Sequence, residues 1–525
     1  MEKRCVRLSY LCVLTLVLSS CGGGGSSGGS QSAPLSNLSV ATWHYDNART
    51  GATPNESSLS PANVNSTSFG VLFSLPVDGA VIGQALYLGS VPVTNKGVHN
   101  VLYVATMHDS VYAFDADTTS GANASPLWTK SLLGSGETTV PMSIHKCQAV
   151  TQWNEVGVIS TPVIDTAGGT LYVVAKSLSN GSPVMRLHAL DVRSGQEKLT
   201  GPVQISASVN VGGLSSTFSA LAEMNRPALL LTNGHVYLGF GSNGCNDFSP
   251  QGWVLSYNAS TLAQEGAFST TPGTILGSIW QKGGGLSADA ESNVYAEAAE
   301  GPSSPGINFA ESMIKLTQSG TQLQATDWFT PYNQDFLRQN DLDLNNAVLI
   351  LPDQPGPFPH LAMGTGKEGT LYVVDRDNMG QYCSTCSVGD VQIVQEVSLA
   401  APNTGSLIYW NSSVYTSGAG FPISAWSLSN GLLSPSPIAQ THGIGGGHSP
   451  VITSNGTSNG ILWQLNSTSL IAYDALTLTT LYSSSQTNGR DTLPAMPHFA
   501  QVIVVNGKVY VSTNNSVVAL GLLKN

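Results

Sequence analysis

The sequence predicts an all-β protein, an eight-bladed β-propeller whose blades are four-stranded antiparallel sheets. Three observations lead to this prediction. One strand pattern returns eight times along the chain, its copies are spaced for four short strands with their loops, and no segment has a sustained helical period. The same strands also allow a pair of β-sandwiches, which is the alternative architecture.

Each copy of the pattern begins with a strand of the form small-Val/Leu-Tyr-Val. A few polar residues follow, and then a second apolar strand that often ends in Asp or Asn. The eight copies lie at residues 101–117, 170–191, 235–258, 293–320, 370–378, 413–431, 461–475 and 508–522. Aromatic and β-branched residues alternate with polar ones, as expected for half-buried strands. We expect the strand "GVLFSLPVD" (70–78) to complete the last blade and close the ring.

The N-terminus has the composition of a secretory signal. Basic residues at positions 3, 4 and 7 precede an apolar run, and small residues precede Cys21. The ending Leu18-Ser19-Ser20-Cys21 resembles a bacterial lipoprotein box, in which cleavage leaves the cysteine as the lipidated N-terminus. We therefore expect a signal peptide over residues 1–20, with a plain, non-lipidated signal as the alternative.

The segment after Cys21 predicts a flexible tether. Residues 21–38 are rich in Gly and Ser and contain too little apolar surface to form a core. Residues 39–525 then form one large repeat domain, since no second linker interrupts them. Gly22, in place of an Asp after the lipid-bearing cysteine, favours the outer membrane or the periplasmic side of the cell envelope.

Composition limits the partners of the domain. Charged residues make up 10% of the chain and the net charge is −12, so the surface repels phosphate backbones and nucleic acid is not an expected partner. No stretch after the signal is apolar for long enough to span a bilayer. The expected membrane contact is the lipid anchor, and we expect a monomer.

Four cysteines remain after the signal and the lipid site are set aside, because Cys5 and Cys12 leave with the signal. An even number of cysteines in an exported protein indicates disulfides. We predict one bond between Cys147 and Cys245 and a small local ring between Cys383 and Cys386. A four-cysteine zinc site is the alternative, although it needs two close pairs and the sequence contains one.

Two further segments carry a family resemblance. They are "WHYDNARTGATPNESSLSPANV" (43–64) and "FDADTTSGANASPLW" (114–128), in which Trp128 takes the place of a docking tryptophan. Together with the eight repeats, they make the sequence resemble the quinoprotein alcohol dehydrogenase-like superfamily. The resemblance implies an eight-bladed propeller that can hold pyrroloquinoline quinone (PQQ) and a calcium ion.

The resemblance also implies a set of site residues. Trp280, in "GSIWQKGGG", takes the place of the aromatic floor under the quinone, and Lys367, in "GKEGTLYVVDR", takes the place of the cation beside it. Glu300 takes the place of a calcium-binding amide, and Glu311 takes the place of the catalytic aspartate. The two glutamates are therefore the predicted metal ligands, and Glu311 is the predicted base.

Several positions depart from the family pattern. Lys176 stands where a metal-binding glutamate is expected, and Cys147 has no adjacent cysteine to cap a quinone. These departures indicate an eroded cofactor site. Asp341 and Asp343, with Asn340 in "RQNDLDLNN", resemble an aspartate-rich family segment, but we interpret them as turn formers.

Two functional hypotheses follow. The first is a binding or scaffolding module at the cell envelope, which uses the face with Trp280, Glu311 and Lys367 to contact envelope proteins or a small polar ligand. The resemblance includes the propeller lipoprotein of the outer-membrane barrel-assembly machinery, a fold-level analogy for a role without a cofactor. The second is a PQQ- and calcium-dependent dehydrogenase that oxidises an alcohol or sugar. Ser387 follows Cys386, so no haem-attachment motif is present and a separate electron acceptor is expected.

Overall fold

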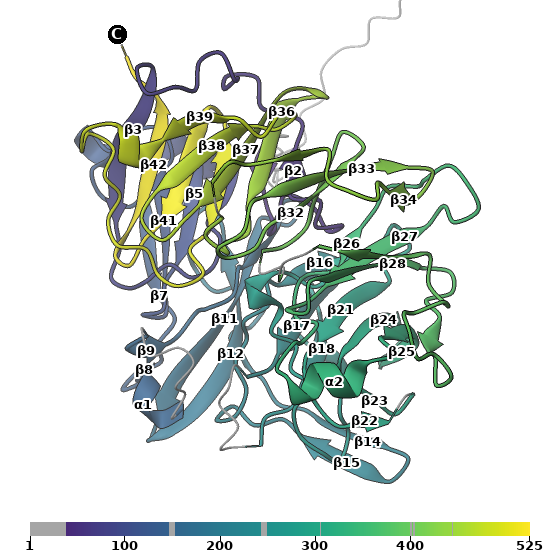
Figure 1. Ribbon diagram of the computed structural model, residues 1–525. Coiled ribbons are helices and arrows are strands. Elements are labelled where there is room, and N and C mark those ends of the chain that lie inside the picture. The colour runs from purple at the N-terminus through teal and green to yellow at the C-terminus, as the bar shows by residue number, and fades with distance from the viewer. Residues whose placement is uncertain are drawn as a thin grey trace, which may run out of the picture. The chain divides into compact units, whose positions relative to one another are not determined.

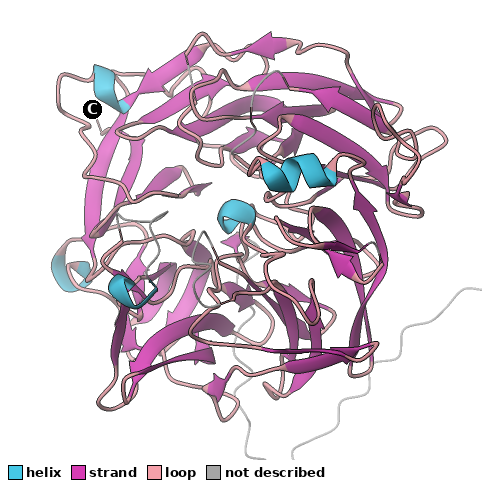
Figure 2. Cartoon of the chain, turned by 60° about the horizontal axis from the view of Figure 1, so that its bottom comes forward, coloured by secondary structure: helices cyan, strands magenta, loops and turns pink. Residues whose placement is uncertain are grey.

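The computed structural model describes residues 38–145, 153–242, 249–304, 306–399, 402, 405–443 and 445–524. Within these residues, eight sheets of four or more strands form the blades of a β-propeller (Figure 1). Strands make up nearly all of the regular structure (Figure 2). None of the helices in these ranges is long and apolar enough to cross a membrane. The predicted all-β fold and its eight blades are confirmed.

The strands of each blade follow one another along the chain. Blade 1 contains β4 (Leu86–Val93), β5 (Gly97–Ala105), β6 (Ser110–Asp115) and β7 (Trp128–Ser131), and blade 2 contains β10 (Val163–Asp165), β11 (Thr170–Ser179), β12 (Ser182–Asp191) and β13 (Val203–Gln204). Blade 3 contains β16 (Leu230–Thr232), β17 (His235–Phe240), β18 (Trp253–Asn258) and β19 (Gln264–Ser269), and blade 4 contains β20 (Ser287–Ala288), β21 (Val294–Ala298), β24 (Ser312–Ser319) and β25 (Gln322–Thr330). Blade 5 contains β26 (Leu349–Ile350), β27 (Leu361–Thr365), β28 (Thr370–Asp375) and β30 (Gln395–Ser398), and blade 6 contains β31 (Ile408–Trp410), β32 (Ser413–Thr416), β33 (Ser424–Ser429) and β34 (Leu432–Leu433). Blade 7 contains β36 (Val451–Asn455), β37 (Ser458–Leu465), β38 (Leu470–Asp474) and β39 (Thr480–Ser483), and blade 8 contains β40 (Val502–Val505), β41 (Lys508–Ser512), β42 (Ser516–Leu522) and β3 (Phe69–Pro76).

Shorter elements extend these blades or connect them. The additional strands are β1 (Ser39–Val40) on blade 1, β8 (Thr138–Pro141) and β9 (Glu155–Val156) on blade 2, β29 (Gln381–Tyr382) on blade 4, β35 (Ala439–Gln440) on blade 6 and β2 (Ala52–Thr53) on blade 7. Among the described residues, two hairpins lie outside the blades, β14 (Ser208–Val211) with β15 (Leu214–Thr217), and β22 (Ser303–Ser304) with β23 (Asn308–Phe309). The helices are α1 (Met142–His145) and α2 (Gln334–Gln339), and the 3₁₀ turns are η1 (Gly121–Asn123), η3 (Gln281–Gly283) and η4 (Ser484–Gln486).

An N-terminal strand closes the ring, as predicted. Strand β3 pairs antiparallel with β42, from Phe69 opposite Leu522 to Pro76 opposite Ser516. In Figure 1 the purple β3 and the yellow β42 lie side by side. The two ends of the domain therefore share one sheet, which ties the last blade to the start of the chain.

In seven blades each copy of the sequence repeat covers the second and third strands, and blade 5 is the exception. In blade 1, for example, the copy at 101–117 covers the second and third strands. In blade 5 the copy at 370–378 falls on the third strand, β28, because the second strand, β27, reads "LAMGT" and has no tyrosine. This offset of one strand accounts for part of the uneven spacing of the copies.

Trp128 docks blade 1 onto blade 2. Its indole nitrogen donates to the backbone oxygen of Val192, 3.2 Å away. The ring lies so close to Gly195 that a Cβ there would approach Trp128 to 2.6 Å, and Gly195 also has a positive φ of 70°. Gly195 of blade 2 therefore lies against the tryptophan of the preceding blade. Only glycine leaves enough space for the indole ring and adopts this backbone conformation without strain.

The segment after the tether crosses the ring axis and bonds to every blade. Backbone oxygens from Leu38 to Gly51 accept hydrogen bonds from the innermost strands of blades 1, 2, 4, 5, 6 and 7, donated by Gly89, Ile164, Ala288, Ile350, Tyr409 and Ile452. Side chains complete the set, since Asn47 donates to Leu231 O of blade 3 and the Tyr45 hydroxyl bonds to Val504 of blade 8. This axial segment, residues 38–53, holds the blades together at the centre.

Arg49 anchors the axial segment. Its guanidinium is 1% exposed and donates to Leu286 O and Leu229 O on the blades, and to Thr42 and Trp43 within the segment. Burial lowers the pKa of Arg49 to about 9. The buried charge is held by neutral oxygens that face it from several directions, which is the arrangement that makes a buried cation tolerable.

The described cysteines agree with one of the two predicted disulfides. Cys383 and Cys386 form a disulfide with a Cα–Cα distance of 5.4 Å. Cys147 and Cys245 lie outside the described residues, as do Cys21, the signal and most of the tether. The Cys147–Cys245 bond, the lipid site and the boundaries at residues 20 and 38 therefore remain predictions.

Candidate functional site

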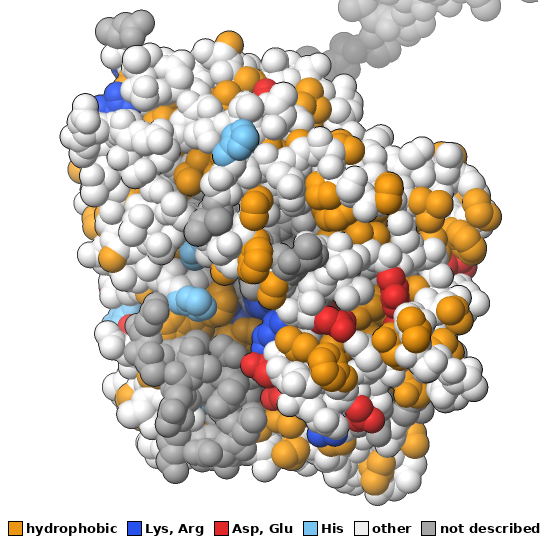
Figure 3. All heavy atoms as spheres, viewed as in Figure 1, with side chains coloured by type: hydrophobic (Ala, Val, Ile, Leu, Met, Phe, Trp, Pro, Cys, Tyr) orange, Lys and Arg blue, Asp and Glu red, His pale blue; other side chains and the backbone are white. Residues whose placement is uncertain are grey.

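A cavity of about 470 Å³ lies where loops from blades 3 to 8 converge on one face of the ring. These loops either follow the second strand of a blade or precede its first strand, so residues far apart in sequence meet near the axis. The lining residues are Ser242, Ser278, Trp280, Lys282, Ala299, Glu300, Asp341, Asp343, Asn345, Lys367, Ala419, Gly446, Gly447, His448, His498 and Phe499. In Figure 3 a hollow in the middle of the face has basic side chains (blue) beside acidic side chains (red) and histidine (pale blue).

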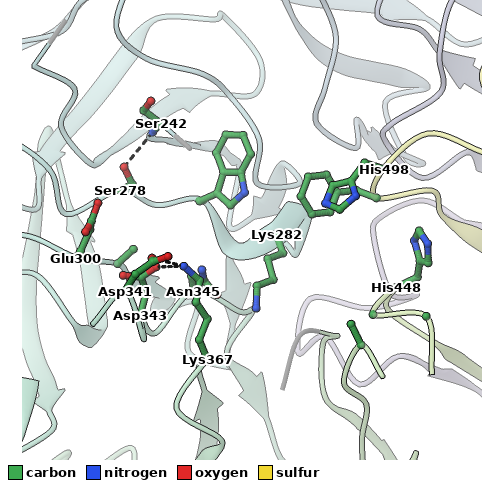
Figure 4. Close-up of a pocket in the computed structure, with 16 residues that line it drawn as sticks. Ser242, Ser278, Lys282, Glu300, Asp341, Asp343, Asn345, Lys367, His448 and His498 are labelled. Carbon is green, nitrogen blue, oxygen red and sulfur yellow. Dashed lines mark hydrogen bonds and ion pairs between the residues drawn. The ribbon is translucent and has the colours of Figure 1, made fainter. Parts of the chain in front are cut away.

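Three carboxylates gather on one wall of the cavity. Oxygens of Glu300, Asp341 and Asp343 lie within 4.8 Å of one another. Lys367 Nζ lies 2.7 Å from Asp343 Oδ2 and also bonds to Asp341 (Figure 4). Asp343 is buried, Glu300 is half-buried and Asp341 is exposed, so the cluster extends from the interior of the protein to its surface.

Local backbone structure explains why these residues meet. Helix α2 ends before Asp341, whose φ of 55° is left-handed and reverses the chain toward the axis. The backbone nitrogen of Lys367 then donates to Asp343 O at 3.0 Å, and Leu344 forms a bridge with Gly366. The acid-bearing loop and the lysine-bearing loop are therefore fixed to each other through the backbone, and their side chains face the same space.

Burial and like charge shape the electrostatics of this wall. Burial raises the pKa of Glu300, and the neighbouring carboxylates of Asp343 and Asp341 raise it further. Burial also raises the pKa of Asp343, although the Lys367 ammonium opposes that rise. For Lys367, burial acts to lower the pKa, but the carboxylates of Asp343 and Asp341 outweigh it and the net shift is upward. Three carboxyl groups therefore share the ammonium of Lys367 within the cluster.

A second lysine enters the cavity from the loop before blade 4. Lys282 lies in η3 with a left-handed φ of 48°, and its backbone oxygen accepts a hydrogen bond from Arg226. In Figure 4 its side chain points toward the acidic wall. Burial, with Lys367 nearby, lowers the pKa of Lys282 to about 8. Trp280, two residues earlier, is 4% exposed, lines the cavity and belongs to the apolar cluster against which Phe499 packs.

Histidine and aromatic side chains form the opposite wall. His448 and His498 lie across the cavity from the carboxylates (Figure 4). Burial lowers the pKa of His448 to about 4, with a further contribution from His498. The guanidinium of Arg226 stacks 4.9 Å from the centre of the Phe499 ring. At neutral pH His448 is therefore neutral and its wall is less charged than the acidic wall.

The structure brings together three of the site residues predicted from sequence. Trp280, Glu300 and Lys367 all line the cavity. Glu311 lies behind the acidic wall instead, with a fully buried side chain whose Oε2 accepts the backbone N–H of Leu344 at 3.0 Å. Burial, with Asp343 nearby, raises its pKa well above the ordinary value. The roles proposed for these residues remain predictions.

Lys176 is not among the residues that line the cavity. It is 2% exposed, and its Nζ donates to the backbone oxygen of Glu223 at 2.7 Å. Burial lowers the pKa of Lys176 to about 7, and burial raises the pKa of Glu223 to about 8. A buried lysine that bonds to the backbone of Glu223 therefore occupies the position where the resemblance implies a metal-binding acid.

Some side chains that line the cavity are not among the site residues predicted from sequence. Asp341 and Asp343 were interpreted as turn formers, yet both carboxylates line the cavity and pair with Lys367. Asp341 does occupy a turn, so the two interpretations are compatible for that residue. Lys282 and Asn345 gave no sequence signal. The resemblance to an aspartate-rich family segment was the signal that pointed to the two aspartates.

Comparisons with solved structures agree with this architecture. The structure is similar to quinohemoprotein alcohol dehydrogenase from Comamonas testosteroni, with a TM-score of 0.60, 15% identity and coverage of 92% of this chain and 80% of that chain. It is similar to a quinohemoprotein alcohol dehydrogenase from Pseudomonas putida HK5, with a TM-score of 0.55, 14% identity and coverage of 92% and 80%. It is also similar to a europium-containing methanol dehydrogenase, with a TM-score of 0.56, 11% identity and coverage of 93% and 98%.

No protein-family model and no curated protein matches the sequence. At these identities the structural similarity concerns the fold. The chain therefore has an eight-bladed propeller fold similar to the folds of quinohemoprotein alcohol dehydrogenase and methanol dehydrogenase.

Proposed function

We propose that the protein is a ligand-binding propeller lipoprotein of the bacterial cell envelope, which binds a small polar ligand through a divalent cation in the axial cavity. One observation carries the proposal. Three carboxylates, two lysines and a tryptophan from the loops of blades 4 and 5 line one cavity of about 470 Å³. Clustered carboxylates recruit a hard cation, and the cation and lysines together attract an anionic or polar ligand.

The donor set fits a hard divalent cation. Calcium binds carboxylate and amide oxygens with flexible geometry. Within the cluster, Oδ1 of Asp343 is buried and has no hydrogen-bond partner among the described residues, and the same holds for Oδ1 of Asn345 and Oε1 of Glu311 nearby. Buried oxygens without partners are costly, and a cation at this wall would satisfy those within its reach.

Calcium titration tests the proposal. We expect isothermal titration of the purified mature protein to detect one calcium site, and Asp343→Asn to weaken it at least about tenfold because a buried ligand oxygen is lost. Asp377→Asn is the matched control, because Asp377 is an exposed acid that pairs with His360 away from the cavity. Equal affinity in all three proteins, or no calcium site, contradicts the proposal.

A PQQ- and calcium-dependent dehydrogenase is the second candidate. It is favoured by the common position of Trp280 and Lys367 in the cavity and by a fold shared with alcohol and methanol dehydrogenases. PQQ, when bound, accepts the two electrons of an alcohol oxidation. Lys367 would contact its oxygens, Trp280 would stack on its ring, and the cluster with Glu300 would hold the metal.

The base is the weakest part of the dehydrogenase assignment. Glu311 does not line the cavity, and one of its oxygens is occupied by the backbone of Leu344. A base must reach the proton that it removes, so Asp343, which lines the cavity, has the better position. The cofactor fits the cation and aromatic positions of this chain better than it fits the catalytic position.

A paired assay distinguishes the two candidates. If PQQ is the ligand, its addition with calcium should quench tryptophan emission, whether the protein is a binding protein or a dehydrogenase. This quenching should diminish in Trp280→Phe. Dye reduction with a panel of alcohols and aldoses should occur only if the protein is a dehydrogenase. Binding without dye reduction supports the ligand-binding role, and dye reduction that is lost in Lys367→Met and Asp343→Asn supports the enzyme.

The envelope location rests on the N-terminal sequence. We expect the protein to fractionate with membranes, and Cys21→Ala to release it because the lipid acceptor is lost. Mass spectrometry of the N-terminal peptide should detect diacyl or triacyl glycerol on Cys21. An unmodified, soluble mature protein contradicts the lipid anchor without affecting the cavity proposal.

A further inference from the structure

The Cys383–Cys386 disulfide lies on a surface loop of blade 5, between β28 and β30. Both cysteines are half-buried, and the two residues between them are exposed. Strand β29 precedes the disulfide and pairs with β25 of blade 4, so the loop is attached to a rigid sheet on one side. The disulfide therefore lies in a surface loop that strand β29 holds against blade 4.

Both sulfur atoms have polar neighbours suited to the reduced state. Cys386 Sγ lies 3.7 Å from Oε1 of Gln392, an acceptor that a thiol can donate to and a disulfide sulfur cannot. Cys383 Sγ lies 3.7 Å from the hydroxyl of Thr385, which can donate to a thiolate. The loop therefore places one polar neighbour beside each sulfur atom, and the reduced cysteines can use these neighbours as hydrogen-bond partners better than the disulfide can.

The acceptor at Cys386 is held in place by a second set of contacts. Gln392 Nε2 donates to Oδ1 of Asp390 at 2.9 Å, which fixes the amide with its oxygen toward the sulfur. Asp390 is 6% exposed and accepts the backbone N–H of Tyr332 at 2.9 Å. This network ties the surroundings of the sulfur to the body of the propeller, so the acceptor is present before any reduction takes place.

A purely structural role is a poor explanation for this bond. A disulfide stabilises a fold mainly by restricting the unfolded chain, and the effect grows with the length of the loop that it closes. This bond joins residues only three positions apart and lies within a single blade. It therefore restricts little of the unfolded chain, whereas a disulfide that a thiol can reach from the surface can exchange with it.

Two exposed valines follow the disulfide in the sequence. The exposed fractions of Val388 and Val391 are 86% and 81%, the two highest among the large hydrophobic residues that are exposed in the described chain. They lie within a few residues of Cys386. Apolar side chains beside an exchangeable disulfide favour a protein thiol, which can cover them on binding, over a small soluble thiol.

We propose that Cys383–Cys386 is a thiol–disulfide exchange site whose substrate is a protein dithiol. A thiolate of the partner attacks Cys383 Sγ, the bond between Cys383 and Cys386 breaks, and Cys386 leaves as a thiolate that takes a proton and donates to Gln392. The second thiolate of the partner then attacks the mixed disulfide and releases Cys383 as a thiol. The partner is oxidised by two electrons to its disulfide, and this protein is reduced by two electrons to its dithiol.

The test uses the folded, full-length mature protein and peptide mapping. The protein is incubated with a purified dithiol protein of the thioredoxin fold, or with dithiothreitol, and free thiols at Cys383 and Cys386 are alkylated and quantified by mass spectrometry. Mapping separates this pair from Cys147 and Cys245. We expect reduction without denaturant, and Val388→Ser with Val391→Ser to slow the protein reaction severalfold while the dithiothreitol reaction keeps its rate.

A second variant tests the chemistry of the sulfur site. Gln392→Met removes the acceptor for the Cys386 thiol, so at equilibrium with a dithiothreitol buffer the dithiol form should decrease about fivefold relative to the disulfide. An unchanged melting temperature checks that the variant is folded. Reduction that requires denaturant overturns the proposal. So does the combination of equal rates in the valine variant and an unchanged equilibrium in Gln392→Met.

Discussion

Replacing Lys367 with methionine removes the ammonium that pairs with the acidic wall of the cavity. Its Nζ lies 2.7 Å from Oδ2 of Asp343, whose side chain is 6% exposed. Removing one partner of a buried ion pair costs about 3–5 kcal/mol, because the remaining charge has no compensation. Lys367 is itself 31% exposed, so we expect the lower end of this range, about 3 kcal/mol at pH 8 without divalent cations.

The assay is urea unfolding followed by tryptophan fluorescence, with and without calcium. At pH 5 the loss should be smaller, because the already raised pKa of Asp343 lets that carboxyl take up a proton in place of the lost ammonium. Calcium should restore stability at pH 8. Its affinity should rise at least about tenfold, since no ammonium competes for the carboxylates.

Lys508→Met is the matched control for this variant. Lys508 pairs with Asp117 at 2.8 Å, and Asp117 is 44% exposed and remote from the cavity lining. A surface pair of this kind contributes about 0–1 kcal/mol, so the control should lose little stability and gain no calcium affinity. An equal loss in Lys367→Met at pH 5 and pH 8, together with no response to calcium, would refute the reasoning.

Three further predictions concern the scaffold. Phe69→Ala, at a fully buried position of the closing strand, should lower the free energy of unfolding by about 3–5 kcal/mol in urea, and a loss below about 1 kcal/mol would argue against closure by β3. Burial raises the pKa of Glu297 to about 8, so its folded form binds more protons than its unfolded form and stability should fall by about 1.4 kcal/mol per pH unit between pH 5 and 7. Glu297→Gln should remove that part of the slope in unfolding curves, and an unchanged slope would contradict the shift. Arg49→Lys keeps the charge but cannot reach all of the acceptors, so the melting temperature should fall by several degrees, whereas an unchanged value would show that the axial segment is not anchored by Arg49.

The fold was accessible from sequence because its signal is local and repeated. Tyrosine-bearing strands with polar turns carry the blade pattern, and each blade repeats it. The axial segment gave no such signal. Residues 38–53 have no period, and their backbone oxygens bond to partners such as Tyr409 and Ile452 that lie hundreds of positions away. Only the closed ring brings those partners to the axis.

The candidate site was accessible only in part. Trp280, Glu300 and Lys367 could be located because the family resemblance assigns a site role to each of these positions, and all three line the cavity. Asp341 and Asp343 lie in a polar stretch whose composition is the same for a solvated turn and for a cavity wall. The backbone bond between Lys367 and Asp343 decides between these environments, and it forms only when two loops pack together.

The placement of Glu311 has a similar cause. Its neighbours in sequence do not reveal that the backbone of Leu344 occupies one of its oxygens, and that contact places the carboxyl behind the cavity wall. The sequence identifies the acids of this region, whereas their depth depends on how the loop of residues 341–345 packs over them. Local sequence therefore does not fix which acid a ligand meets.

The most direct test of the account is a crystal structure of the protein soaked with calcium or terbium, with the ion located by anomalous scattering. The account predicts one strong peak in the axial cavity, within bonding distance of Glu300, Asp341 and Asp343. An ion bound elsewhere on the surface, or no peak at a concentration that saturates ordinary calcium-binding proteins, would contradict the claim that this acidic wall is a cation site.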